Sequence, residues 1–196
     1  SGMDPQNKSG VEWTETKLSP KRRQTVYLAH AQFNSYGGTS WRDFCSAATE
    51  LAKYINRVDD VVIDSGSVPF GPATTMTGDG PFQHDLYVLT GQKWSNTDVE
   101  LECGSGVVPF VYLKSSPVHA VQWSIGLEVP LLINDPWKTI MTTDHPNGGI
   151  FTRYPQVIAW LMSKKARDAT AAECHKWGYD RSSLGGVDRE MSLFEI

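Results

Sequence analysis

The chain has 196 residues, of which 40% are hydrophobic and 20% are charged, and this composition suits a single buried core. Its formal net charge is −4, and its one cationic run is residues 21–23, so it has no basic field for a nucleic-acid polymer. Three cysteines without CxxC spacing argue against a disulfide framework and a zinc site. No apolar run reaches the length of a membrane span and no signal peptide is recognisable, so we expect a cytoplasmic protein.

Short apolar runs alternate with helical patterns in the first half of the chain. Residues 1–24 are polar and are expected to form a flexible arm. Residues 25–31 fit a buried first strand, and residues 60–66 fit a second short strand that ends in a turn. Between them, apolar residues recur at helical spacing from Trp41 to Ile55, which is the strongest helix signal in the chain.

Residues 98–135 are predicted to form the central unit of the fold, a strand, a Gly-rich turn, a helix and a second strand. Ser116 can cap the helix, and Pro117 suits its first position because a missing N–H costs nothing there. The apolar run before Asn134 and Asp135 is interpreted as a parallel strand. Ligands of parallel sheets lie at the carboxyl ends of the strands, which points function at residues 103–106 and 134–137.

The second half of the chain completes a predicted α/β fold. Pro155 is expected to open a helix, and a further helical piece is expected at residues 169–176. The alternation of elements predicts one doubly wound domain with a mostly parallel sheet of about five strands, Rossmann-like or flavodoxin-like. We expect an arm at residues 1–24, the α/β domain at 25–168, and a C-terminal helix and tail at 169–196.

No Walker A motif, Rossmann glycine triplet, GxSxG elbow or HExxH motif is present. What remains is a set of polar residues at predicted strand ends and in loops. The ligand site is therefore expected in the loops after the strands, at residues 30–38, 64–80 and 103–106. One alternative is a Cys-dependent hydrolase in which Cys103 acts with His119, although a cysteine before a tight turn is more often a small buried residue.

The order of the parts resembles the nucleoside 2-deoxyribosyltransferase family and its nucleotide N-glycosidase relatives. Residues 26–29 resemble the opening strand of that family, residues 84–86 its Asp-bearing segment, and residues 97–99 the start of its next strand. Residues 120–130 resemble the apolar pattern of its catalytic helix. The likeness covers residues 25–165.

This resemblance implies cleavage or transfer at the N-glycosidic bond of a small nucleoside or nucleotide. Such chemistry needs two carboxylates, one to stabilise the cationic sugar and one as an acid, and Asp85 and Glu102 are the candidates. The nucleophilic Glu of the family is replaced by Ala120, so a non-catalytic nucleotide-binding or protein-interaction module of the same fold is an alternative. No cofactor or metal is expected, and homo-oligomerisation stays open. The expected substrate-binding residues are Tyr27, His30, Gln32, Trp41 and His119.

Overall fold

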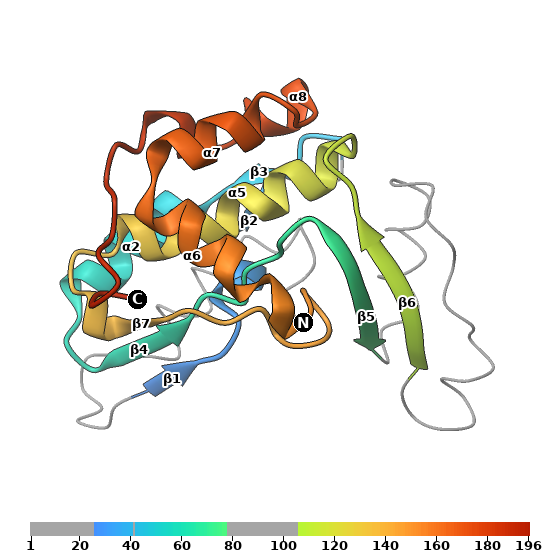
Figure 1. Cartoon of the computed structure of the whole chain (residues 1–196). Helices are drawn as coiled ribbons and strands as arrows, with labels where there is room; N and C mark the ends of the chain where they lie inside the picture. The colour runs from blue at the N-terminus through green and yellow to red at the C-terminus, as the bar shows by residue number, and fades with distance from the viewer. Residues whose placement is uncertain (1–25, 41, 78–105) are drawn as a thin grey trace.

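The computed structural model describes residues 26–40, 42–77 and 106–196, and Figure 1 shows helices stacked on one side of a small sheet. In these ranges the chain forms strands, five α-helices and short 3₁₀ helices. The elements, in chain order, are β1 Val26–Leu28, η1 Ala31–Asn34, β2 Tyr36–Gly37, β3 Cys45–Ser46, α2 Ala48–Arg57, β4 Val61–Asp64, β5 Gly71–Thr77, β6 Gly106–Tyr112, α5 Pro117–Leu132, η2 Pro136–Lys138, β7 Thr139–Ile140, η3 Phe151–Arg153, α6 Tyr154–Met162, α7 Lys164–Ala171, α8 Lys176–Tyr179 and η4 Leu184–Gly186.

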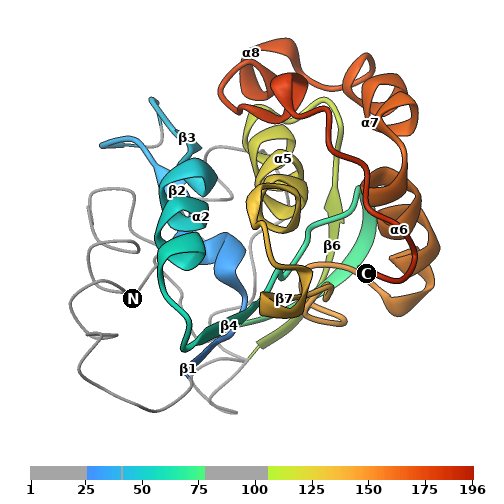
Figure 2. The ribbon, with the colours of Figure 1, turned by 90° about the vertical axis from the view of Figure 1, so that its left-hand side faces the viewer.

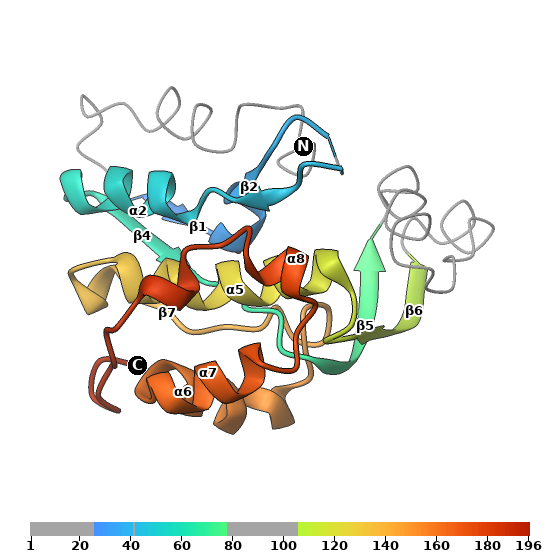
Figure 3. The ribbon, with the colours of Figure 1, turned by 90° about the horizontal axis from the view of Figure 1, so that it is seen from above.

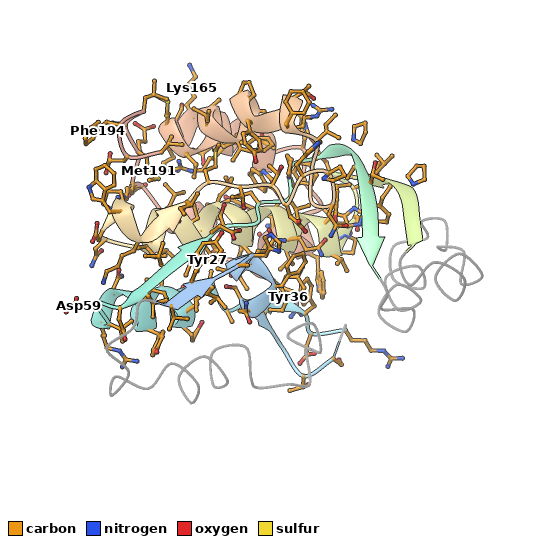
Figure 4. All side chains as sticks on the ribbon, turned by 90° about the horizontal axis from the view of Figure 1, so that it is seen from below. Tyr27, Tyr36, Asp59, Lys165, Met191 and Phe194 are labelled. Carbon is orange, nitrogen blue, oxygen red and sulfur yellow. The ribbon has the colours of Figure 1, made fainter. Side chains whose placement is uncertain are left out.

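The main sheet is parallel, in the order β1-β4-β7. Successive side chains of a strand point to opposite faces, and Val61 and Ile63 of β4 are buried toward α2 and α5. Tyr27 lies on the other face and is 56% exposed; Figure 4 shows that face from below. The helices cover the upper face of the sheet in Figures 1 and 2. The parallel arrangement confirms part of the predicted fold, but the sheet has three strands in the described residues, not five.

Helix α5 is the centre of the core, and Figure 3 shows it between α2 and α6. Val121 and Ile125 pack in one cluster with α2 and the sheet, whereas Trp123 and Leu127 pack in a second cluster with α6 and the C-terminal residues. A helix that is apolar around its whole circumference is buried on all sides. Ser116 accepts the backbone N–H of His119 and Pro117 is the first helical residue, which confirms the predicted helix start.

The prediction of a strand after this helix was wrong, because α5 continues through Pro130 to Leu132. Proline removes the N–H that would bond the carbonyl of Gly126, four residues earlier. The hydroxyl of Ser67 donates to that carbonyl instead, at 2.9 Å. A Cβ on Gly126 would lie 2.9 Å from Cα of Ser67, so the glycine allows this close approach. A contact from a distant loop therefore keeps the helix intact.

Two further expectations are corrected by the sheet pairings. Strand β6 pairs antiparallel with β5 and belongs to a different sheet from β7, so the described part of the predicted unit, residues 106–135, does not form a crossover of one parallel sheet. The helix expected from Trp41 begins at Ala48. Phe44 contacts the ring of Tyr36 at 4.9 Å between centroids, and the next two residues form β3, so these apolar side chains pack from a hairpin.

The C-terminal residues pack onto the helical side of the molecule. Helix α6 confirms the helix predicted at Pro155, and α7 and α8 replace the single piece expected at residues 169–176. The buried guanidinium of Arg167 donates to three backbone carbonyls, those of Trp160, Val187 and Arg189. None of the helices in the described ranges is long and apolar enough to cross a membrane. The proposed division into arm, domain and tail stays a prediction.

Candidate functional site

The three parallel strands end at one edge of the sheet, and each is followed by a residue with a left-handed backbone. His30 follows β1 with φ 52°, Gly66 follows β4 with φ 57°, and Asp144 follows β7 with φ 49°. Left-handed conformations are uncommon for residues other than glycine and cost free energy, so they tend to gather at functional sites. The carboxyl end of the sheet is therefore the candidate site.

His30 and Asp144 meet at this edge. Their side chains approach to 3.4 Å between Nε2 and Oδ1, and they are 37% and 22% exposed, so both are accessible to a ligand. A Cβ on Gly66 would lie 3.0 Å from both Cα and Cβ of His30, which only glycine avoids. Asn147 donates to the second carboxylate oxygen of Asp144 at 2.9 Å. The imidazole and the carboxylate are thus held side by side.

Asp64, buried at the end of β4, joins the loops around this pair. Tyr27 donates its hydroxyl to one carboxylate oxygen at 2.5 Å, and Thr142 donates to the other at 2.6 Å. The hydrogen bond to Asp64, with burial and the carboxylate charge, raises the pKa of Tyr27 to about 12, so the phenol stays a donor. The hydroxyl of Thr142 also accepts the N–H of Gly66 at 3.0 Å. These bonds fix the loops after β4 and β7 to each other.

The structure places the predicted site residues in different environments. His30 lies at the site, and Tyr27 supports it through Asp64. Gln32 is fully buried in η1. His119 is also fully buried, its Nδ1 accepts the N–H of Leu113, and burial lowers its pKa to about 4. The remaining candidates lie outside the described residues: Trp41, Asp85, Glu102 and Cys103.

The sequence reasoning missed the role of the loop after β7. Residues 136–149 were predicted only as a loop rich in turn residues, although Asp144 and His145 stand side by side in it. A short apolar run followed by two titratable residues and two glycines was the available signal. Residues 134–137 were expected to follow the carboxyl end of a parallel strand, and this was wrong, because they precede β7 and lie at the amino end of the sheet.

Comparisons with known proteins agree on one family. A family model described as amidohydrolase family matches residues 16–196. Protein FwdA of Methanocaldococcus jannaschii is 55% identical over 188 residues, which is 95% of this chain and 33% of FwdA. The FhcA component of the formyltransferase/hydrolase complex of Methylorubrum extorquens is 38% identical over 185 residues, which is 91% of this chain and 34% of FhcA.

A solved structure shows the same relationship. In the crystal structure of the formyltransferase/hydrolase complex FhcABCD from Methylorubrum extorquens with methylofuran, one chain superimposes with a TM-score of 0.80 at 36% identity. The match covers 99% of this chain and 35% of that chain. The chain therefore spans about one third of the length of the relatives that it matches.

These matches overturn the resemblance to nucleoside 2-deoxyribosyltransferases and the N-glycosidase interpretation that rests on it, and relatives named as a formyltransferase/hydrolase do not support the binding-module alternative. The Cys103 alternative agrees with the family only in being a hydrolase, and Cys103 lies outside the described residues. The likeness at residues 120–130 was not specific, because an apolar helical pattern that contains Gly and Pro occurs in buried helices of many families. In the structure Ala120 is fully buried within α5. The segments at residues 84–86 and 97–99 lie outside the described residues.

Proposed function

Because this chain belongs to the amidohydrolase family, we propose that its His30–Asp144 edge forms part of an active site that hydrolyses the C–N bond of an N-formyl amide. The family supports amide hydrolysis, and the relatives named formyltransferase/hydrolase point to a formyl group as the acyl part. The observation that carries the proposal is the close pair of imidazole and carboxylate, both on left-handed backbone, at the carboxyl end of a parallel sheet.

In this mechanism Asp144 is the general base. Its carboxylate takes a proton from a water molecule, whose oxygen attacks the formyl carbon and forms a tetrahedral oxyanion. The imidazole of His30, next to Asp144, donates a hydrogen bond to the developing negative charge. The C–N bond then breaks, Asp144 returns the proton to the leaving nitrogen, and the products are formate and the amine.

An imidazole nitrogen and a carboxylate oxygen are also donors that a divalent metal ion accepts in hydrolases. A metal ion held by His30 and Asp144 would polarise the formyl carbonyl or acidify the attacking water. Within the described ranges no third His, Cys, Asp or Glu side chain completes such a group. Any further ligands would therefore come from outside those ranges.

The test is formate release from an N-formyl amine by the protein, purified with whatever partner proteins accompany it, as in the related complex. Asp144→Asn keeps the shape of the side chain and removes the base, so turnover should fall about 10²-fold or more. Asp59→Asn is the matched control, because Asp59 is a fully exposed carboxylate where β4 begins, at the left edge of Figure 4. No formate from the unmodified protein, or full turnover in Asp144→Asn, would refute the proposal.

A further inference from the structure

Asp64, the last residue of β4, is a buried carboxylate that the proposed hydrolysis does not use. It is 1% exposed, and no Lys, Arg or His side chain of the described residues forms an ion pair with it. Burying a carboxylate is costly unless hydrogen bonds replace the lost water. Here the hydroxyls of Tyr27 and Thr142 do so, one on each carboxylate oxygen. A charge kept in the interior beside a candidate active site indicates a role other than stability.

The charge of Asp64 sets the direction of the hydrogen bonds around Thr142. A threonine hydroxyl has one hydrogen to donate, and an ionised carboxylate can only accept. Thr142 therefore gives its hydrogen to Asp64, at 2.6 Å, and its oxygen is left to accept the backbone N–H of Gly66, at 3.0 Å. These three residues, the Asp64 relay, form one continuous run of hydrogen bonds.

The Asp64 relay reaches both members of the His30–Asp144 pair. Gly66 has a left-handed backbone and packs so closely on His30 that a Cβ would lie 3.0 Å from its Cα. Thr142 stands two residues before Asp144 in the same loop. The pair itself is separated by 3.4 Å, which is wider than a normal hydrogen bond. The spacing of the pair is therefore set by the loops that carry it, and the relay connects those loops.

Backbone hydrogen bonds also hold the two loops together, without the side chains of the relay. The N–H of Ser65 donates to the carbonyl of Ile140 at 2.9 Å, and the N–H of Ser67 donates to the carbonyl of Thr142 at 2.7 Å. Both bonds should survive when the side chains of the relay are changed. Loss of the relay is therefore expected to shift the loops slightly rather than to unfold them, which separates a positioning role from a folding role.

We propose that Asp64 is a positioning residue of the hydrolase: through the hydroxyl of Thr142, its carboxylate sets the spacing of His30 and Asp144 for attack on the formyl carbon. The inference rests on the proposed function. Asp144 takes a proton from water while His30 faces the developing oxyanion, and both geometries are lost if the pair spreads. A displacement of about 1 Å at such a site can cost about 10² in rate. Asp64 itself touches neither the water nor the substrate.

Steady-state kinetics of formate release test the Thr142 step. Thr142→Val has nearly the same shape but no hydroxyl, so kcat should fall about tenfold or more while KM changes less than about twofold. Thr142→Ser keeps the hydroxyl and should keep the turnover. Thr139→Val is the matched control, because Thr139 is a buried threonine of β7 whose hydroxyl has no hydrogen-bond partner in the part of the chain that the structure describes. Unchanged kcat in Thr142→Val, a change in KM alone, or an equal loss in Thr142→Ser would overturn the proposal.

A double-mutant cycle tests whether Asp64 acts through Thr142. Asp64→Leu has nearly the same shape and removes the carboxylate without leaving a buried charge unpaired. It should lower kcat about as much as Thr142→Val does. The two changes together should cost no more than either alone, because both break the same relay. Losses that multiply in the double variant would show that the two side chains act independently, and would overturn the proposal.

Hydrogen exchange of the Gly66 amide separates this inference from the proposed function, because it needs no turnover. The amide should exchange faster in Thr142→Val and in Asp64→Leu than in the unmodified protein, and at the unmodified rate in Thr142→Ser and Thr139→Val. This pattern without any formate release from the unmodified protein would refute the hydrolase and leave the relay standing. Unchanged exchange in Thr142→Val, in a protein that does release formate, would refute the relay and leave the hydrolase standing.

Discussion

The two ends of the parallel sheet are built differently. At the carboxyl end, backbone strain at His30 and Asp144 is combined with a buried carboxylate, Asp64, that joins two loops. At the amino end, polar side chains form hydrogen bonds with backbone groups at the ends of helices. Asn56 bonds the end of α5, and Lys138 donates to the carbonyl of Val58 after α2. Both ends expose aromatic residues, so aromatic exposure alone does not locate a site. The carboxyl end is the better candidate because His30 and Asp144 are a polar pair on strained backbone, and such strain persists only where the surrounding structure enforces it.

The largest expected effect is at Gly66. Gly66→Ala places a methyl group against His30 in a left-handed conformation. Strain and overpacking should together lower the free energy of unfolding by about 4 kcal/mol, and displaced His30 should slow turnover. Gly186→Ala is the control, since a Cβ at that position would have nothing within 4 Å and its backbone is not left-handed. Denaturant unfolding measures both variants, and equal stability of the two would contradict the role of Gly66.

The second prediction concerns the pH dependence of folding stability, to which the buried His119 contributes. Burial lowers the pKa of His119 to about 4 from the unfolded value of 6.5. The unfolded chain therefore binds more protons between these values, and stability present above pH 6.5 is lost as the pH falls to 4. The loss should be about 3 kcal/mol. His119→Asn keeps an acceptor for Leu113 but cannot titrate, so chemical unfolding at several pH values should show a flatter profile. An unchanged profile would mean that another group is responsible.

The sequence was sufficient wherever local chemistry decides structure. Ser116 and Pro117 located the start of α5. His30, singled out as a polar residue near the end of the apolar run at residues 25–31, lies at the candidate site. It was insufficient where a contact between distant segments decides. Nothing near Pro130 in the sequence indicates that Ser67 will bond Gly126. Asp144 likewise becomes a site residue only when β7 pairs with β4, and a strand of two residues has no detectable period.

The contact of Ser67 with α5 gives the third prediction, which connects the carboxyl-end loops to the core. Ser67→Ala leaves the carbonyl of Gly126 without a donor, and a buried carbonyl left unpaired costs about 2 kcal/mol. Ser124→Ala is the control in the same helix, because its hydroxyl bonds the carbonyl of Ala120, which also accepts a helical N–H. In a Pro130→Ala background the cost of Ser67→Ala should shrink, since alanine restores the N–H. An unchanged cost there would contradict this account of the helix.

The smallest effect is expected at the amino end of the sheet, where Asn56 spans the end of α5. Its amide donates to the carbonyl of Leu132 at 3.0 Å and accepts the N–H of Asn134 at 2.8 Å. Asn56→Ala should lower the free energy of unfolding by about 1 kcal/mol, because the lost partners can turn to water. Asn56→Asp should cost no less, since a carboxylate opposes the negative end of the helix dipole and cannot donate to Leu132. Formate release should stay at the unmodified level in both variants, because they leave the His30–Asp144 edge untouched. A drop in turnover without further loss of stability would show that the two ends of the sheet are coupled, and would end the division between a stabilising end and a functional one.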